Sequence, residues 1–408
     1  MKKFTKILLI ALIVIASMFA SYENPKLVEI PKTKIKYFLK KLGLVENFFV
    51  NTNQIDEKNL NKISKKEKKE EFFANSFTLE IEKIKNLDSK TAGVFFDKNK
   101  KLQIFTQKGQ LIENDKFQEI NLPLDFTTEK EGGVRNVIFY KDMYLALLSR
   151  KKLDCYYASL IETKTQLELI KTKCIPDNEK VNFAGLGGGY TYLNNKLIFS
   201  IGTPTHNSEI IDKLAQDKNS LFGKIYSLEN DKEKGEVFAI SLFSNGHRNP
   251  QGLIEQNNKL YSTEHGPEGG DELNRIEINK NYGWPIVSLG TRYGGKSYKK
   301  KSKTFVDPIF SFLPAIAPSS LNECPKDLKM YYKMFTCLMG LTLREMSIII
   351  YLLDEKDQLI SYEKIPLQKR LRHFGVNFNS KLFSDSNHNF YFSADNDGIY
   401  KAKFKDFR

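Results

Sequence analysis

The sequence predicts an all-β fold of the β-propeller type, and two observations carry this prediction. From residue 75 onward the chain is a series of short apolar runs separated by turn signals, and nothing there has the pattern of a long helix. Many runs also share one local form, in which an apolar strand and a polar turn precede an aromatic-rich strand; repetition of such a unit is typical of propeller blades. Strand-like runs occupy residues 92–97, 101–106, 137–140, 144–148, 196–201 and 259–263.

The length of the repetitive body is compatible with six blades. Its roughly 330 residues divide into about 55 residues per blade, which is enough for four strands and some long loops. This weak periodicity does not by itself fix the number of blades. The run at 346–353 is apolar except for Ser347 and too short to span a bilayer, and its three consecutive isoleucines favour a buried strand.

The first twenty residues have the pattern of an export signal. Lysines at positions 2, 3 and 6 precede an apolar stretch at 7–20. A clean small-x-small cleavage site is missing, because Met18 lies two residues before Ala20. The stretch is also short for a spanning helix, which needs about 20 apolar residues. Cleavage and retention therefore both stay open, and either outcome exports the protein to the periplasm or the cell surface.

Three segments follow from these patterns. Residues 1–21 are the signal peptide or membrane anchor, and residues 22–74 are a Lys-rich tether with little periodicity. Residues 75–408 form the propeller.

The charge is strongly basic, with 63 Lys and Arg against 49 Asp and Glu and a net charge of +14. Such an excess can indicate nucleic acid or a lipid surface as partner. Here it lies mostly in lysine runs, such as 65–69 and 299–301, without the interleaved aromatic residues of a base-stacking platform. A solvated lysine-rich surface explains it better, and we expect no nucleic-acid partner.

The four cysteines suit an oxidising compartment. Cys155 and Cys174 flank two strand-like runs whose midpoint falls at residues 164 and 165, so a hairpin folded there places the two cysteines opposite each other. We therefore predict a Cys155–Cys174 disulfide. Cys324 and Cys337 are the remaining pair, and four buried free thiols are the alternative.

The segment from 246 to 288 is dense in residues with special backbone or chemical properties. It reads GHRNPQGL at 246–253, EHGPEGGDELN at 264–274 and NYGWP at 281–285. Together these motifs resemble the signature of the glucose/sorbosone dehydrogenase family, which includes soluble quinoprotein glucose dehydrogenases and aldose sugar dehydrogenases. The resemblance covers roughly residues 180–320 and continues more weakly to the end. It implies six blades, pyrroloquinoline quinone (PQQ) as cofactor, calcium, and a sugar or related alcohol as substrate.

The residues expected to hold the cofactor are basic. Arg248 offers a planar cationic guanidinium and Asn249 offers an amide. These groups suit the carboxylates and ring carbonyls of an acidic quinone. By resemblance Arg344 and the pair Arg370 and Arg372 also contact the cofactor. A loop arginine that satisfies backbone carbonyls, and an arginine pair on a solvated strand face, are the alternatives.

The residues expected to hold calcium supply oxygen. The turn at Gly266 and Pro267 can expose two successive carbonyl oxygens, the kind of ligand that calcium takes, and by resemblance they bind the calcium that polarises the quinone. Asp271, Glu272 and Tyr282 are candidates for a second, structural calcium site. The alternative for these three is a hydrogen-bonded acidic turn.

The general base of the family is not found where the resemblance places it. A histidine should take the proton from the sugar C1 hydroxyl, but the matching stretch has Leu186 there, or Gly185 if the register shifts by one. Among the five histidines, His206 is the best replacement, and an exposed loop histidine is its alternative reading. His265 is expected to shape the calcium turn.

Two functions from different classes follow. The first is an exported PQQ- and calcium-dependent oxidoreductase acting on aldose sugars or related alcohols, with an unidentified electron acceptor. The second is a non-catalytic propeller of the same family that binds carbohydrate or protein, which the replaced histidine favours. Another chemistry on a propeller, such as a hydrolase or lyase, also stays open because fold does not fix function.

Overall fold

The described part of the chain is almost entirely β-structure. The computed structural model describes residues 69–205, 207–231, 237–300 and 303–408, all within the second of two compact units, 67–408. The export signal at 1–21 and the tether up to residue 68 lie outside the described residues. In the described part, no helix is both long and apolar enough to cross a bilayer.

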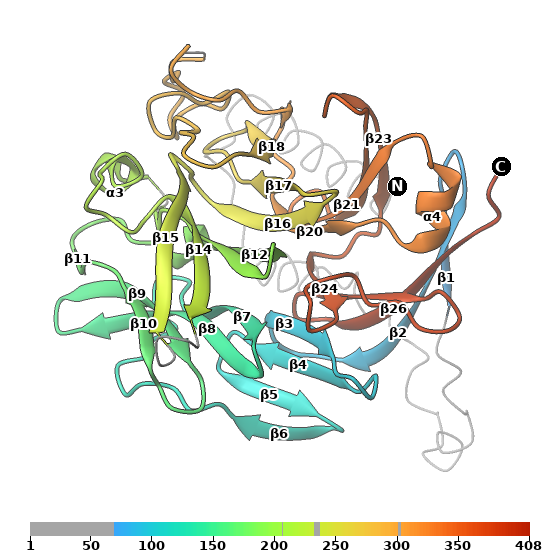
Figure 1. Ribbon diagram of the computed structural model, residues 1–408, viewed down its shortest axis with the longest axis horizontal. Coiled ribbons are helices and arrows are strands. Elements are labelled where there is room, and N and C mark those ends of the chain that lie inside the picture. The colour runs from blue at the N-terminus through green and yellow to red at the C-terminus, as the bar shows by residue number, and fades with distance from the viewer. Residues whose placement is uncertain (1–68, 206, 232–236, 301–302) are drawn as a thin grey trace, which may run out of the picture. The chain divides into compact units, whose positions relative to one another are not determined.

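The described strands form six blades, which confirms the predicted propeller (Figure 1). Four blades are separate antiparallel sheets, and the other two are joined into one sheet by the parallel pair β24–β3. The innermost strands are β3, β7, β12, β16, β20 and β24; each contacts the next, and β24 contacts β3. They therefore encircle a common centre.

The bounds of the elements follow chain order. Blade one comprises β3 (Thr91–Phe96), β4 (Leu102–Thr106), β5 (Gln110–Glu113) and β6 (Lys116–Glu119). Blade two comprises β7 (Val134–Tyr140), β8 (Met143–Lys152), β9 (Cys155–Glu162) and β10 (Glu168–Lys171), and β11 (Ile175–Pro176) pairs with β9. Blade three comprises β12 (Gly187–Leu193), β13 (Lys196–Ile201), β14 (Lys224–Asp231) and β15 (Val237–Asn245). Blade four comprises β16 (Pro250–Gln256), β17 (Lys259–Glu264), β18 (Asp271–Ile276) and β19 (Phe310–Phe312). Blade five comprises β20 (Pro318–Glu323), β21 (Thr336–Thr342), β22 (Ser347–Leu353) and β23 (Leu359–Pro366). The connections include a short 3-10 helix η2 (Phe183–Gly185) and the helices α3 (Glu209–Lys213) and α4 (Lys326–Tyr331).

The sixth blade combines both ends of the described chain. It comprises β24 (Leu371–Val376), β25 (Phe390–Ala394), β26 (Gly398–Lys405), β2 (Thr78–Asn86) and β1 (Glu70–Phe73). β2 pairs antiparallel with β26, from Thr78 opposite Lys405 to Asn86 opposite Gly398. This pairing closes the ring. β1 begins before residue 75, so paired structure starts inside the segment that we expected to be tether.

Tight asparagine turns connect several strands, as the sequence indicated. Asn194 and Asn195 both have positive φ, at 50° and 64°, and join β12 to β13. Asn257 and Asn258, at 55° and 60°, join β16 to β17 in the same way. Two consecutive left-handed residues match the right-handed twist of the flanking strands, and asparagine tolerates that conformation.

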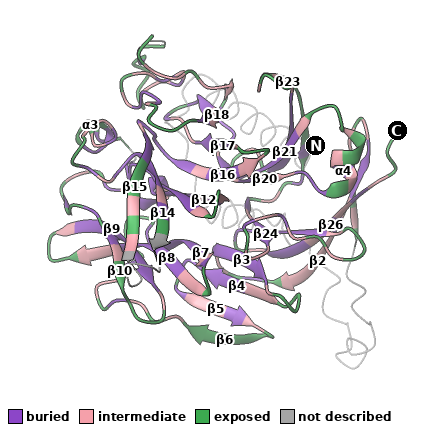
Figure 2. Ribbon diagram, in the orientation of Figure 1, coloured by how far each residue is buried: buried purple, intermediate pink, exposed green. Residues whose placement is uncertain are grey.

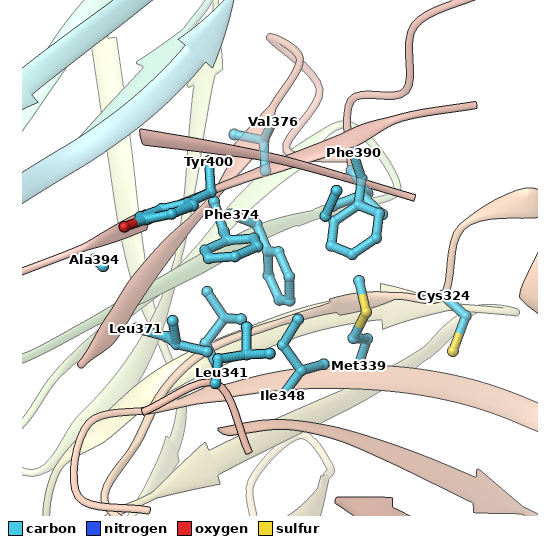
Figure 3. Close-up of a cluster of buried hydrophobic side chains, with 14 of the residues drawn as sticks. Cys324, Met339, Leu341, Ile348, Leu371, Phe374, Val376, Phe390, Ala394 and Tyr400 are labelled. Atoms are coloured by element: carbon cyan, nitrogen blue, oxygen red, sulfur yellow. The ribbon is translucent and has the colours of Figure 1, made fainter. Parts of the chain in front are cut away.

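The core lies between neighbouring blades. Figure 2 shows buried inner strands and an exposed outermost strand β6. In Figure 3, side chains of blade five, such as Met339 and Ile348, face side chains of blade six, such as Leu371 and Phe374. Burying a side chain of this size stabilises the fold by about 1.5–3 kcal/mol. All seven residues of β22 are buried, so the prediction of a buried strand at 346–353 is confirmed.

Both cysteine pairs form disulfides, and the structure describes no free cysteine. Cys155 and Cys174 are bonded with Cα atoms 5.6 Å apart, which confirms the predicted bridge. The hairpin begins in the predicted register, with Ile161 opposite Glu168. Cys324 and Cys337 bracket α4, with Cα atoms 5.5 Å apart, and both are buried.

Removal of the Cys155–Cys174 bridge should destabilise the propeller. The bridge closes a loop with a sequence separation of 19, so the double variant Cys155→Ala/Cys174→Ala should lose about 3 kcal/mol of unfolding free energy. Urea denaturation of the oxidised proteins measures this loss, and Cys324→Ala/Cys337→Ala is the matched control with a separation of 13. Peptide maps that show Cys155 and Cys174 as free thiols in protein from an oxidising compartment would contradict the assignment.

Candidate functional site

A polar pocket lies where the inner strands begin. Part of its lining comes from the starts of all six inner strands or from the segments just before them, because successive inner strands run in the same direction around the centre. The rest comes from loops between outer strands, such as the β17–β18 and β21–β22 loops. The pocket has a volume of about 300 Å³, at the lower end of the range for small-molecule sites. Its lining is Lys90, Glu131, Arg135, Asn182, Ala184, Gly185, Thr205, Arg248, Asn249, Gln251, His265, Gly266, Pro267, Asp271, Tyr293, Ala315, Ala317, Leu343, Arg344, Arg370 and Arg372.

Arg248 is fixed by contacts on several sides. Its backbone N–H donates to Oε2 of Glu264 at 3.1 Å, and its Nη1 donates to the carbonyl of His265 at 3.2 Å. Its guanidinium lies over the ring of Trp284, 5.3 Å from the centroid. The side chain is nearly buried, and Nε has no hydrogen-bond partner among the described residues. Arg248 is thus held in place with hydrogen-bonding capacity left over.

Arg370 and Arg372 lie at the start of β24 and share one carboxylate. Arg372 is buried and makes a two-pronged ion pair with Asp395. Arg370 is half-exposed, and its Nε lies 3.8 Å from Oδ2 of Asp395. The alternative of a solvated arginine pair therefore fails for Arg372. Arg344 also lines the pocket, with an exposed side chain.

Asn249 lies beside Arg248, and both the oxygen and the nitrogen of its side-chain amide form hydrogen bonds. Its Oδ1 accepts from the backbone N–H of Gly187 at 3.0 Å, and its Nδ2 donates to the carbonyl of Ala184 at 3.2 Å. The structure thus brings all five predicted cofactor-binding residues to one pocket.

Sequence reasoning missed Arg135, which is the second residue of β7. It lines the pocket while only 7% exposed. Burial lowers its pKa to about 9, and the neighbouring charge of Arg372 adds to the effect. The only available signal was an arginine, followed by Asn136, near the start of the otherwise apolar strand-like run of β7, in a blade without a recognised motif.

Asp271 fixes the turn that was predicted to bind calcium. Its Oδ1 accepts from the backbone N–H of Gly266 at 2.8 Å, and its Oδ2 accepts from those of Ile316 and Ala317 at 2.7 and 2.6 Å. The carbonyl oxygens of Gly266 and Pro267 accept no hydrogen bond from the described residues. Asp271 therefore holds the turn, while the carbonyl oxygens of two pocket-lining residues remain without a hydrogen bond from the described residues.

Glu272 and Tyr282 lie outside the pocket lining. Glu272 accepts a hydrogen bond from Asn274, and burial together with the nearby Glu264 raises the pKa of Glu272 well above its ordinary value. The hydroxyl of Tyr282 donates to the carbonyl of Arg275 and accepts from the N–H of Glu277. In the described part of the chain, no group of three or more His, Cys, Asp or Glu side chains is placed to hold a metal. These contacts favour the hydrogen-bonded acidic turn over a second calcium site.

The expected position of the general base does not face the pocket. Leu186 is fully buried in a hydrophobic cluster with Phe183 and Phe199 and does not line the pocket, so this position offers no group to a substrate. Gly185 does line the pocket, but a Cβ there would lie 2.5 Å from the carbonyl oxygen of Thr203. Neither position has room for a side chain directed at a substrate.

His206 lies outside the described residues, although its neighbour Thr205 lines the pocket. Among the described histidines, His265 is the one in the lining. Its Nε2 lies 2.7 Å from the carbonyl of Pro318, which can only accept, so Nε2 carries the proton and Nδ1 keeps a lone pair. Burial lowers the pKa of His265 to about 4, so the ring is neutral near pH 7.

The fold defines a class, the six-bladed propellers, and solved structures of aldose sugar dehydrogenases share it. The soluble aldose sugar dehydrogenase from Escherichia coli, solved in the apo form, superposes with a TM-score of 0.62 at 20% identity, covering 80% of this chain and 99% of that one. The PQQ-bound aldose sugar dehydrogenase from Streptomyces coelicolor has a TM-score of 0.54 at 17% identity, covering 80% and 98%.

The family model for Glucose / Sorbosone dehydrogenase matches residues 94–389, and the chain belongs to this family. Two curated relatives match over shorter segments. The Synechocystis protein slr1608 is 34% identical over 46% of this chain and 49% of its own length. The Escherichia coli aldose sugar dehydrogenase YliI is 40% identical over 30% of this chain and 37% of its own length. These matches thus span about half or less of each relative.

Asp271→Asn should loosen the turn at Gly266. An amide has only one acceptor oxygen, so it leaves at least one of three backbone donors facing an NH₂ group. We expect a loss of about 2–4 kcal/mol in unfolding free energy, measured by urea denaturation. Glu272→Gln is the matched control; it should cost less than about 1 kcal/mol because burial and the nearby Glu264 already raise the pKa of that carboxyl, so its charged form is disfavoured. Equal losses for both variants would contradict the role given to Asp271.

Proposed function

We propose that this protein is an exported oxidoreductase that uses PQQ and calcium to oxidise aldose sugars or related alcohols. One observation carries the proposal, the excess of positive charge in the pocket. Among its described lining residues are six cationic side chains, Lys90, Arg135, Arg248, Arg344, Arg370 and Arg372, against two carboxylates, Glu131 and Asp271. Such a set suits a ligand with several carboxylates.

The arginines fit an acidic quinone in geometry as well as in charge. Each guanidinium is a planar fork that pairs with a carboxylate through two parallel hydrogen bonds. Arg248 keeps an unpartnered buried Nε, while Arg372 already has Asp395 as partner. When bound, the quinone would accept the electron pair and hydrogen that leave the sugar carbon. The chain's own residues would bind and orient it.

Calcium is supported by the turn at Gly266 and Pro267. Both residues line the pocket, their carbonyl oxygens take no hydrogen bond from the described residues, and calcium prefers oxygen ligands of this kind. The turn is held by Asp271 rather than by the ion itself. A cation there would lie in the same pocket as the arginines and would add to the charge that favours an anionic ligand.

Proton removal from the sugar needs a base from the chain. His206 stays a prediction. His265 is a second candidate, since its Nδ1 lone pair belongs to a neutral ring in the pocket lining. Its low pKa makes it a weak base. General base catalysis contributes about 10²- to 10⁴-fold, so a poor base would leave slow oxidation.

A second candidate function is binding without turnover, on the same propeller. One observation favours it: Leu186 lies in the core and Gly185 has no space for a side chain. In that case the pocket would hold an acidic ligand or carbohydrate and release it unchanged.

Export is supported by the two disulfides and by the basic and apolar pattern of the first twenty residues. We propose a periplasmic or cell-surface location, with residues 1–21 cleaved or retained as an anchor. The electron acceptor would then be a partner in that compartment.

Addition of the quinone and calcium to purified protein tests the proposal. We expect saturable binding, seen as a shift of the quinone absorbance, and at least tenfold weaker binding for Arg248→Ala, because a charge-assisted hydrogen bond contributes about 1.5–3 kcal/mol. Arg150→Ala is the control, since Arg150 pairs with Asp125 away from the pocket. Absence of binding by the unmodified chain would overturn the proposal.

Turnover of aldoses by the loaded protein then separates the two functions. Dye reduction with a panel of sugars should be detectable, and it should fall strongly in either His206→Ala or His265→Gln. Tight quinone binding without any sugar oxidation would instead establish the non-catalytic alternative.

A further inference from the structure

We infer that Arg135 is a further binding residue of this pocket and that it holds a carboxylate of the bound acidic quinone. This inference rests on the proposed function and extends it to a residue that carries no family motif. Three observations support it: Arg135 is buried, it lacks a charged partner among the described residues, and it lies beside other residues of the pocket.

Arg135 is buried without adequate partners. It is 7% exposed, and its Nε makes no hydrogen bond with the described residues. Its Nη2 reaches only the carbonyl of Ala184 at 3.4 Å, longer than the usual 2.7–3.2 Å. No described carboxylate lies within ion-pair distance of it. An uncompensated buried charge is costly, and such groups are normally paired or coordinated.

The two carboxylates that attract Arg135, Asp395 and Glu131, already have partners, and Glu131 pairs with Lys90 at 3.1 Å. Asp395 makes the two-pronged pair with Arg372 and also lies 3.8 Å from Nε of Arg370. Arg372 acts on Arg135 as a repulsive charge rather than as a partner. The protein thus places two cations near one carboxylate and a third cation, Arg135, beside them. A carboxylate bound in the pocket would give Arg135 the ion pair that it lacks among the described residues.

The location of Arg135 matches that of a ligand contact. The carbonyl of Ala184, which receives its hydrogen bond, also receives Nδ2 of Asn249 at 3.2 Å and Nε2 of Gln251 at 3.2 Å. Groups that share one acceptor atom lie within a few ångströms of each other. A ligand that reaches the Arg248 and Asn249 pair therefore passes within reach of Arg135.

A carboxylate fits this position better than a hydroxyl or a carbonyl. Arg135 needs a negative charge to offset its burial, and its planar guanidinium can bind both oxygens of a carboxylate. A neutral sugar hydroxyl would accept one hydrogen bond and leave the charge unbalanced. The chemistry of the residue thus points to the acidic quinone rather than to a neutral sugar.

Arg135→Met is the sharpest test, because methionine keeps much of the volume and removes the charge. In protein without quinone, the variant should unfold at a higher temperature than the unmodified chain, since an unpaired buried charge is gone. Its affinity for the quinone, in the presence of calcium, should fall about 10- to 100-fold, as for a lost charge-assisted hydrogen bond. Arg135→Lys should recover part of this affinity.

Arg372→Met is the matched control. It removes an equally buried arginine but leaves Asp395 without its main partner, so it should lower both the quinone affinity and the unfolding temperature of the free protein. The trimethyl ester of the quinone gives a second readout. The unmodified chain should prefer the free acid to the ester, and this preference should shrink in Arg135→Met.

The outcomes separate the inference from the proposed function. If the unmodified chain binds no quinone, both fall. If it binds quinone and Arg135→Met binds equally well with an unchanged preference for the free acid, the inference fails and the proposed function stands. Weaker binding by Arg135→Met together with a raised unfolding temperature supports the inference, whereas weaker binding with a lowered unfolding temperature would show a structural role and overturn it.

Discussion

The pairing of β2 with β26 is the interaction on which the rest of the structure depends. β2 comes from the start of the described chain and β26 from its end, and their antiparallel ladder closes the ring of six blades. Closure leaves no long unpaired edge in the last blade. It also brings the starts of all six inner strands to one end of the ring. Residues as far apart in sequence as Lys90 and Arg372 therefore line one pocket, and no local segment could build that site alone.

The positive charge of the pocket lowers the stability of the free protein and favours the binding of an anionic ligand. Buried arginines are costly unless they are paired. Arg372 pairs with Asp395, but Arg135 and Arg248 have no described carboxylate within ion-pair distance. Hydrogen bonds within the protein hold Arg248 and Asp271 in place, so the site is ordered before a ligand arrives. Pre-organisation of this kind reduces the ordering cost of binding. Local conflicts with the rules of stable packing are expected at functional sites, and the Nε atoms of Arg135 and Arg248, which have no partner among the described residues, are conflicts of this kind.

Sequence reasoning succeeded where local chemistry decides the structure. The Cys155–Cys174 bridge followed from hairpin symmetry, and the residues around Arg248 followed from a dense motif. Sequence reasoning was less informative where no motif was present to fix which residues of a strand face the pocket. Side chains alternate along an extended chain, so whether a residue faces the pocket or the core depends on a register that the sequence alone does not show. Leu186, taken as the position of the base, lies in the core and not in the pocket lining. Arg135 was missed because its blade carries no motif and its neighbours in the pocket are distant in sequence.

The central claim is that an acidic quinone binds among the arginines at the end of the ring where the inner strands begin. A crystal structure of the full chain soaked with PQQ and calcium tests it most directly. The account predicts quinone density in the pocket, with carboxylates within hydrogen-bond distance of Arg135, Arg248 and Arg372 and an ion at the carbonyl oxygens of Gly266 and Pro267. Quinone bound elsewhere on the protein, or a pocket that stays empty at saturating quinone, would contradict it.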